Sequence, residues 1–289
     1  MRVAKIVGEP RWDTPLRLLA ALHYLVLDGR ASWNCVDAAF SEHADFLARF
    51  VAEQPVQTNE VQRSWGLLPC FLLLAARTGA CTFDLIELGP SAGLNLVWDR
   101  YRYRYRVGAW GRRPASLELT GAERRGLPAT LLQERPHVRG RVGIDLDPID
   151  VTTDDGSRLL RSFVWADQTD RLERLDRAIT DLREDPPTLI RGDFVELLPG
   201  VLGRRRADAL TVVFETATLA YVSPEGRAAV RGALASAGRD GALAFVSTGR
   251  PLDPAVEAYG LYVTLWPSGD REEVAVLDYH AAWLDWIAG

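Results

Sequence analysis

The chain has 289 residues, of which 47% are hydrophobic and 25% charged, and its formal net charge is −5. This composition is ordinary for a folded protein with one large domain, or one domain with a smaller cap. The negative net charge argues against a broad surface for DNA or RNA. No apolar run reaches the roughly 18–20 residues of a membrane helix, and the first residues lack the apolar segment of a signal peptide, so we expect a cytoplasmic protein.

The cysteines and histidines show no metal-type spacing. The three cysteines are Cys35, Cys70 and Cys81, and the four histidines are scattered along the chain. An odd, small number of cysteines is typical of a reducing compartment, where they act as small core residues. We therefore expect no structural metal.

Residues 1–80 are predicted to form an N-terminal helical cap. Leucines recur at spacings of three and four over residues 15–28, which indicates a helix that ends at Gly29. Residues 36–53 predict a second helix. A third, over residues 59–79, contains Pro69, which predicts a kink or break.

Residues 81–289 are predicted to form an α/β domain, because short apolar runs alternate with helical segments. Strands are expected at residues 83–88, 141–146, 187–193, 209–215 and 242–248, and helices at residues 158–185, 194–202 and 223–238. Residues 258–267 and 272–280 predict a closing β-hairpin. This order favours a doubly wound, mostly parallel Rossmann-like sheet with helices on both faces.

A stretch of alternating Tyr and Arg interrupts the α/β pattern. In residues 101–106, YRYRYR, one face would carry the tyrosines and the other the arginines, which predicts a strand or hairpin inserted near 101–120. A half-buried strand with a solvated Arg face is the favoured interpretation. The alternative is an anion-binding rim over the site.

The turn after the first strand is the first candidate site. Residues 87–95, ELGPSAGLN, follow a strand and are expected to open a helix, so small residues let the backbone approach a ligand near free N–H groups. An acid at the strand end suits a cationic amine. The candidate cofactor-binding residues here are Glu87, Gly89, Ser91, Gly93 and Asn95.

Acidic residues also end the later strands. Asp145 and Leu146 end the second strand, where a carboxylate can take both hydroxyls of a ribose. Asp193 and Phe194 end the third, where an acid and an apolar neighbour suit an adenine ring. Glu215 ends the fourth. Any one of these acids is by base rate a cap or a solvated turn residue, but their order predicts one site for S-adenosylmethionine.

The motifs ELGPSAGLN, VGIDLDP, IRGDFVELLP and VVFETATLAYVSPE resemble the successive motifs of class I S-adenosylmethionine-dependent methyltransferases. Together with LLAALHYLVLDG, QTNEVQRSWGLLP and VWADQTDRLERL, they are more closely similar to an uncharacterised bacterial family, the domain of unknown function 2332, over nearly the whole chain. The first resemblance implies a methyltransferase-like fold and S-adenosylmethionine as cofactor.

If the protein transfers a methyl group to a small-molecule acceptor, catalysis is mostly proximity. The candidate catalytic residues are Glu215, as a base or a ligand-orienting carboxylate, and Tyr221. Aromatic faces can stabilise a cation. The candidate acceptor-binding residues, from the cap and the inserted strand, are Glu60, Arg63, Trp65 and Tyr101, with helix capping as the alternative role for Glu60.

Two other functions compete. Residues 89–93, GPSAG, match the G-x-S-x-G pattern of α/β-hydrolases, with Ser91 as nucleophile and His280 late in the chain. Against a hydrolase, residues 1–80 offer helices where several strands are needed. The other alternative is a fold that binds a nucleoside-like ligand without chemistry.

Overall fold

The computed structural model describes residues 11–288, which form two compact units. One unit contains the chain up to Asn59 together with Ile149–Ile179, and it is helical. The other contains Glu60–Pro148 and the chain from Thr180 onward, and it holds the strands. The helices expected over residues 1–80 are therefore divided between the two units.

The helical unit buries one apolar face of each of its main helices. Its elements are α2 (Thr14–Leu27), η1 (Trp33–Cys35), α3 (Val36–Glu42), α4 (Ala44–Glu53), α6 (Asp154–Ser162) and the first part of α7 (Thr169–Glu184). Leu22 and Leu25 of α2 pack with Leu47 and Phe50 of α4, and Phe163 lies against this cluster. The recurring leucines of α2 thus form its buried stripe.

Two helices predicted as continuous are interrupted in the structure. The segment 36–53 breaks at His43, which leaves helical geometry and places its ring Nε2 3.1 Å from the carbonyl of Arg30. The segment 158–185 breaks after α6, where the ring of His23 lies 2.9 Å from the carbonyl of Val164. In both places a side chain engages the backbone of another segment, so the helical pattern alone did not reveal the break.

The second unit is built on a nine-stranded sheet with the order β5-β12-β11-β10-β9-β8-β1-β6-β7. Its strands are β1 (Thr82–Leu88), β5 (Ala122–Glu123), β6 (His137–Asp145), β7 (Thr188–Arg191), β8 (Leu210–Phe214), β9 (Leu243–Gly249), β10 (Tyr259–Leu265), β11 (Asp270–Leu277) and β12 (Trp283–Trp286). The strands β7, β6, β1, β8 and β9 are parallel, and β10 and β11 form an antiparallel hairpin. The expected α/β class, the mostly parallel sheet and the closing hairpin are confirmed.

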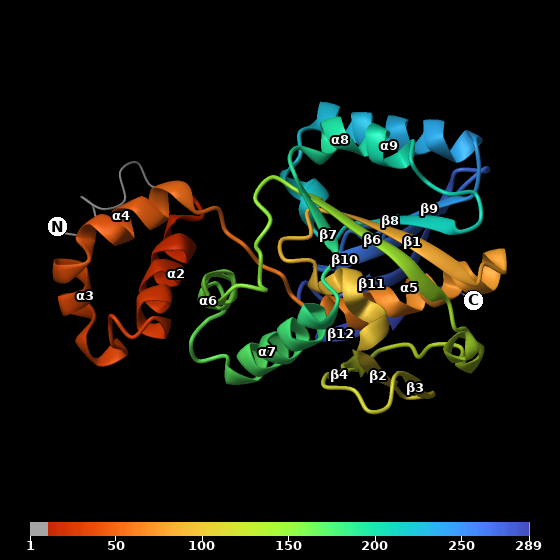
Figure 1. The fold of residues 1–289 in the computed structure, drawn as a ribbon. Helices are drawn as coiled ribbons and strands as arrows, with labels where there is room; N and C mark the ends of the chain where they lie inside the picture. Colours follow the sequence, from red (N-terminus) through yellow and green to blue (C-terminus); the bar gives the residue numbers. More distant parts are fainter. Residues whose placement is uncertain (1–10, 289) are drawn as a thin grey trace. The chain divides into compact units, whose positions relative to one another are not determined.

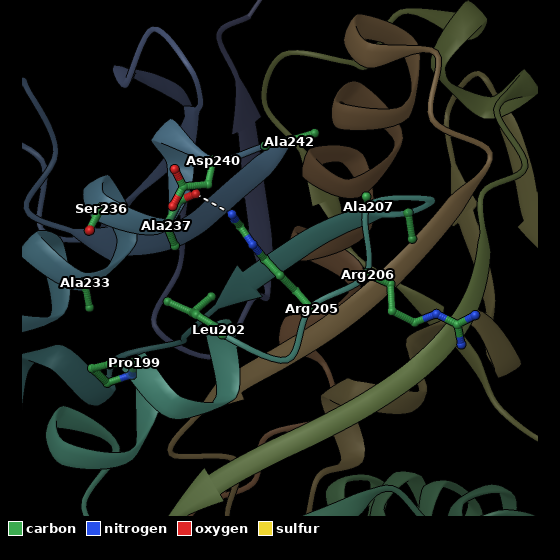
Figure 2. A pocket seen from close by; sticks show the side chains of 13 residues that line it. Pro199, Leu202, Arg205, Arg206, Ala207, Ala233, Ser236, Ala237, Asp240 and Ala242 are labelled. Atoms are coloured by element: carbon green, nitrogen blue, oxygen red, sulfur yellow. Dashed lines mark hydrogen bonds between the residues drawn. The ribbon is translucent and has the colours of Figure 1, made fainter.

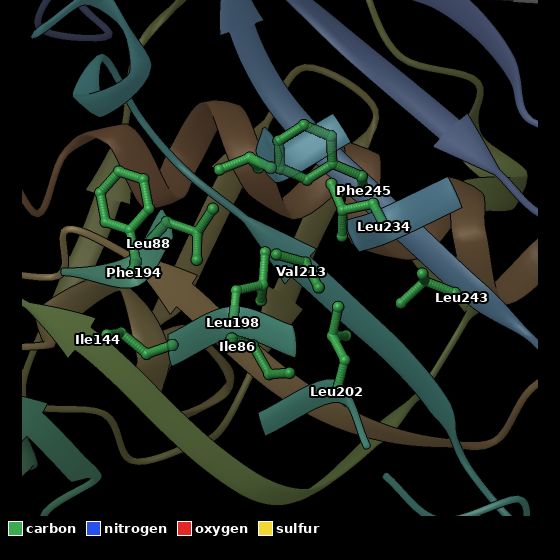
Figure 3. Close-up of a cluster of buried hydrophobic side chains, with 11 residues drawn as sticks. Ile86, Leu88, Ile144, Phe194, Leu198, Leu202, Val213, Leu234, Leu243 and Phe245 are labelled. Carbon is green, nitrogen blue, oxygen red and sulfur yellow. The ribbon is translucent and has the colours of Figure 1, made fainter. Parts of the chain in front are cut away.

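Both faces of the parallel strands are covered. The helices α8 (Phe194–Leu202) and α9 (Pro224–Arg239) lie along one face (Figure 1). Figure 3 shows the cluster beneath them, where Leu198 and Leu234 meet Ile86 and Val213 of the strands. On the other face, the Phe71 ring of α5 (Arg63–Thr78) lies 5.4 Å from the ring of Phe214. All five residues of β8 are buried because the strand is covered on both sides.

Helix α5 runs through Pro69 without ending. A proline has no N–H, so the carbonyl four residues earlier, that of Trp65, has no helical partner. The hydroxyl of Tyr105 donates to this carbonyl at 2.5 Å. The expected break is absent because a side chain from the inserted segment replaces the missing donor.

The Tyr–Arg stretch begins a small sheet of order β3-β2-β4, made of β2 (Arg102–Tyr105), β3 (Gly108–Gly111) and β4 (Glu118–Thr120). Tyr103 and Tyr105 are buried, whereas Arg102 and Arg104 both pair with Glu118 on β4. These pairs confirm the interpretation as a half-buried strand, because both arginines use their charge within this sheet. The described connections also include η3 (Ala129–Gln133).

The segment after β1 differs from the expected helix. It is the 3₁₀ segment η2 (Leu94–Arg100), in which Val97 departs from helical geometry. A second 3₁₀ turn, η4 (Thr218–Tyr221), follows β8. Among the described residues, no helix combines the length and apolar character needed to cross a membrane.

Candidate functional site

The sheet reverses its direction of growth at β1. After β1 the chain adds β6 and β7 on one side, and then returns to add β8 and β9 on the other. In open α/β sheets, ligands bind beyond the carboxyl ends of the strands at such a switch point. Glu87, Asp145 and Glu215 stand where β1, β6 and β8 end, and the charges of Asp145 and Glu215 both act on Glu87. The structure thus gathers three of the predicted carboxylates at one edge.

The turns after β1 and β8 are strained and touch each other. Ser91 and Ala217 have φ angles of 55° and 67°, a region that non-glycine residues rarely adopt. Gly89 also has a positive φ, and a Cβ atom there would lie 2.4 Å from Cγ2 of Thr218. Glycine is required at this position because the β8 turn packs directly on the β1 turn. Strain of this kind is concentrated at binding and catalytic sites.

Glu87 is a buried carboxyl with one unsatisfied oxygen. Its side chain bonds to that of Asn95, whose Oδ1 accepts a hydrogen bond from the Ser64 hydroxyl at 2.7 Å. The other carboxyl oxygen, Oε2, has no hydrogen-bond partner among the described residues. Burial raises the pKa of Glu87 to about 8, and the nearby Asp145 adds to this, while Asn95 and Arg63 oppose it. At neutral pH the carboxyl is therefore mostly protonated.

Asp145 holds the turns after β1 and β6 beside Glu87. Its Oδ2 accepts the Ser91 N–H at 2.8 Å, and its Oδ1 accepts the Asp147 N–H at 2.9 Å. The neighbouring carboxylate of Asp147 pairs with Arg191 of β7. Each oxygen of Asp145 keeps a further lone pair, so the carboxylate can still accept ligand hydroxyls. The Ser91 N–H, by contrast, is not free for a ligand carboxylate.

Glu215 is fully buried and well satisfied. Its carboxylate accepts the N–H and the hydroxyl of Thr248 at 2.7 and 3.1 Å, and the N–H of Leu219 at 3.2 Å. Burial raises its pKa, and these donors act in the opposite direction. The carboxylate therefore holds the η4 turn against β9, and this geometry fits an organising role better than that of a general base.

The residues expected to surround an adenine have three different roles in the structure. Asp193 caps α8 by accepting the N–H of Val195, and Phe194 is buried in the core beneath α8 (Figure 3). Leu146, beyond the end of β6, is 68% exposed. Of these three, Leu146 offers an accessible apolar surface and Phe194 does not, because α8 begins at Phe194 and turns its ring inward.

The expected acceptor-binding residues also separate. Trp65 and Tyr101 are fully buried, and their polar atoms donate to the carbonyls of Arg104 and Leu94. They belong to the core and present no face to an acceptor.

The other two acceptor-binding candidates, Glu60 and Arg63, bind backbone groups, and the catalytic candidate Tyr221 lies at the surface. Glu60 accepts the N–H of Gln62 at 3.2 Å, which is a local contact in the turn before α5 and not a cap of the helix. Arg63 donates through Nε to the carbonyl of Tyr279 and through Nη1 to that of Thr216. Tyr221, at the end of η4, is 76% exposed.

Two contributions to this edge were absent from the sequence predictions. Ser64 orients Asn95, and Thr218 fills the space over Gly89. Both come from segments distant in sequence from the turn that they support, so no local pattern indicates them. Within residues 11–288, no three His, Cys, Asp or Glu side chains gather as metal ligands.

A family model described as an uncharacterized protein conserved in bacteria, DUF2332, matches residues 2–286. The chain belongs to this family. The resemblance to it found in the sequence is thereby confirmed. No match was found among curated proteins.

This DUF2332 protein has a cavity of about 470 Å³ at the amino ends of β8 and β9 (Figure 2). Arg205 and Arg206 line it, but Arg205 donates to the Ala237 carbonyl and Arg206 lies near the carboxylate of Asp208. The cavity is at the opposite end of these strands from the strained turns. It therefore does not belong to the carboxyl-edge site, by which we mean Glu87, Asp145, Glu215 and the turns after β1 and β8.

Ser91 of the DUF2332 protein has a strained backbone, as a hydrolase nucleophile does. Within residues 11–288, its hydroxyl lacks the hydrogen bond to a base that such a nucleophile makes. Its buried hydroxyl has no hydrogen-bond partner within the described part of the chain. His280 follows β11, which is separated from β1 by β8, β9 and β10. A nucleophilic serine needs a base within hydrogen-bond reach, so this arrangement favours a ligand-binding turn.

Proposed function

We propose that this protein binds S-adenosylmethionine at the carboxyl edge of β1, β6 and β8 and transfers its methyl group to a small-molecule acceptor. The observation that carries the proposal is Glu87, a buried carboxyl with an unsatisfied oxygen beside two strained turns at the switch point. An ammonium group satisfies such an oxygen and compensates a charge there.

The residues present fit the parts of this cofactor unevenly. Glu87, held by Asn95, suits the amine. Arg63 uses Nε and Nη1 for backbone carbonyls, which leaves Nη2 for the carboxylate. Asp145 suits the ribose hydroxyls, and Leu146 gives an apolar surface for the base. S-adenosylmethionine would supply an electrophilic sulfonium methyl group, while these side chains orient it.

The acceptor side of the proposal depends on the β8 turn. Glu215 fixes this turn through Thr248 and Leu219, and the exposed Tyr221 follows it. Since methyl transfer relies on positioning and exclusion of water, a rigid turn between cofactor and acceptor contributes more than an additional base. Binding without catalysis remains the alternative outcome, and formation of S-adenosylhomocysteine separates the two.

Calorimetry tests the binding step through the number of protons that binding releases. Because the Glu87 carboxyl is mostly protonated at pH 7, an ammonium group that binds beside it lowers its pKa and releases about one proton. Titrations with S-adenosylhomocysteine in buffers of different ionisation enthalpy measure that release. We expect about one proton for the parent, and for Glu87→Gln no release and an affinity about tenfold or more lower.

The matched control is Asp84→Asn, which removes a carboxylate from the same strand, where Asp84 pairs with Arg139. It should bind S-adenosylhomocysteine as the parent does. Absence of binding at millimolar ligand by folded parent protein, or equal affinity in Glu87→Gln, would refute the proposed site.

A further inference from the structure

A groove lies beside the carboxyl-edge site, on the α9 face of the sheet. Its volume is about 1160 Å³. One wall is α9, and the floor is formed by β9 and β10, where Ser247, Gly249 and Thr264 line it. At one end the lining includes Ala217 and Thr248, which belong to the strained β8 turn and its anchor. The groove therefore begins at the turn that packs on Gly89.

The groove is lined by four arginines and by no acidic residue. They are Arg227 and Arg231 from α9, and Arg250 and Arg271 from the sheet side. Because Arg227 and Arg231 are four residues apart on one helix, their side chains lie on the same face. With a net charge of −5 for the whole chain, four positive charges in one hollow are a local exception.

Among the described residues, two of these arginines lack the carboxylate partners that several buried or half-buried arginines of the sheet unit have. Arg139 pairs with Asp84 and Asp208, and Arg141 pairs with Asp99. Within residues 11–288, neither Arg231 nor Arg250 has a carboxylate partner. A guanidinium binds a carboxylate or phosphate through paired hydrogen bonds, so Arg231 and Arg250 can each meet an anionic group of a ligand.

The other two groove arginines are held without losing their charge. Arg227 donates through Nη1 to the carbonyl of Leu219 at 3.3 Å. The guanidinium of Arg271 lies 3.4 Å from the centroid of the Tyr262 ring. Neither contact neutralises the cation, so both positive charges remain available to a ligand.

Two carboxylates near the groove, those of Glu215 and Glu273, are engaged with other groups. Glu215 lies behind Thr248, is fully buried and accepts hydrogen bonds from that residue. Glu273, opposite Tyr262 in the sheet, accepts the N–H of Leu252 at 3.0 Å. Neither lines the groove. The charged side chains of the lining are therefore all positive.

Aromatic rings complete the lining. Tyr259 and Tyr279 pack edge to face with their centroids 4.7 Å apart, and Trp266 lines the groove near the other end of β10. A hollow of this volume with a few charged groups among apolar rings has the character of a small-molecule site. Its size does not match the extended basic surface that a nucleic acid requires.

We propose that this groove binds a small organic anion, in which a phosphate or carboxylate group meets the arginines and a ring lies on the aromatic side chains. Resting on the proposed function, this anion is the methyl acceptor, because the groove begins at the β8 turn beside the Glu87 site. The groove lining is positively charged and lacks carboxylates. The carboxyl-edge site, by contrast, carries the carboxyl groups that suit an amine.

Direct binding of simple anions tests the assignment. The probes are inorganic phosphate, phenyl phosphate and benzoate, measured by calorimetry at low ionic strength. We expect phenyl phosphate to bind about tenfold or more tightly than inorganic phosphate, since its ring is removed from water. Benzoate tests a carboxylate in place of the phosphate. Added salt should weaken binding of all three.

The variants Arg231→Gln and Arg250→Gln should each weaken phenyl phosphate binding about tenfold or more. The control is Arg239→Gln, which removes the same charge from the last turn of α9 outside the groove, where Arg239 contacts Ser236. It should bind like the parent. Absence of phenyl phosphate binding, or equal weakening by all three substitutions, overturns the proposed anion site.

The two proposals fail in distinguishable ways. Phenyl phosphate should bind Glu87→Gln as well as the parent, because Glu87 does not line the groove. If the parent binds phenyl phosphate but not S-adenosylhomocysteine, the anion site stands and its role as the acceptor site is refuted. If the nucleoside binds and no anion does, the groove assignment is refuted and the Glu87 site stands.

Discussion

The sharpest prediction concerns the stability of the protein with pH, which Glu87 should control. Its folded-state pKa of about 8 lies above its ordinary value of 4.5 because the side chain is buried. Between these values the folded state holds a proton that the unfolded state has lost. Stability from this group is therefore fully present below pH 4.5 and is lost as the pH rises toward 8.

The size of the effect follows from the same shift. At about 1.36 kcal/mol for each pH unit, this carboxyl lowers the free energy of unfolding by about 4 kcal/mol between pH 5 and pH 8. Glu87→Gln keeps the shape and removes the titration. We therefore expect parent and variant to have similar stability at pH 5, and the variant to be more stable at pH 8.

Urea unfolding at pH 5, 6.5 and 8 measures this difference, with the midpoint compared between parent and variant at each pH. Other titrating groups are common to both proteins and cancel in the comparison. Asp84→Asn again provides the control, because it removes a carboxylate that is paired with Arg139. A difference between Glu87→Gln and parent that stays constant from pH 5 to pH 8 would refute the protonated, buried carboxyl.

Three further substitutions test other contacts. Tyr105→Phe should lower the free energy of unfolding by about 1–2 kcal/mol, and less in a Pro69→Ala background, where an N–H again serves the Trp65 carbonyl; equal costs in urea unfolding of both backgrounds would argue against this role. Glu215→Gln should destabilise by about 1–3 kcal/mol, because an amide NH₂ would face backbone donors, and an unchanged midpoint would contradict it. Ser91→Gly should raise the free energy of unfolding by about 1 kcal/mol through relief of the positive φ of Ser91. A fluorophosphonate probe should leave Ser91 unlabelled in the parent, and labelling would support the hydrolase function instead.

Strand positions could be predicted from the sequence where burial is uniform. The apolar run of β8 and the acids at the ends of β1 and β6 lie as expected, because a strand buried on both faces has few alternatives. The start of the helix expected at residue 223 also agrees with the structure, where Ser223 caps α9 by accepting the Gly226 N–H. These features depend on neighbours in the chain.

Side-chain direction could not be predicted in the same way. Phe194 follows Asp193 directly, yet one belongs to the core and the other caps a helix. The ring of Trp65 stacks on that of Tyr105 with centroids 5.3 Å apart, a contact across distant segments that the apolar sequence of α5 does not encode. The roles of these residues are decided by packing between segments that are distant in the sequence. Local sequence patterns do not show which segments meet.

The helical unit is composed of two stretches of chain, one that ends at Asn59 and one that spans Ile149–Ile179. Leu159 and Phe163 of the second stretch cover the apolar cluster of the first. During synthesis, the N-terminal helices therefore emerge long before the residues that complete their core. β1 and β6 leave the ribosome in the interval, so the sheet can begin to pair first. A chain interrupted before residue 149 should thus leave its earliest helices with an uncovered apolar face.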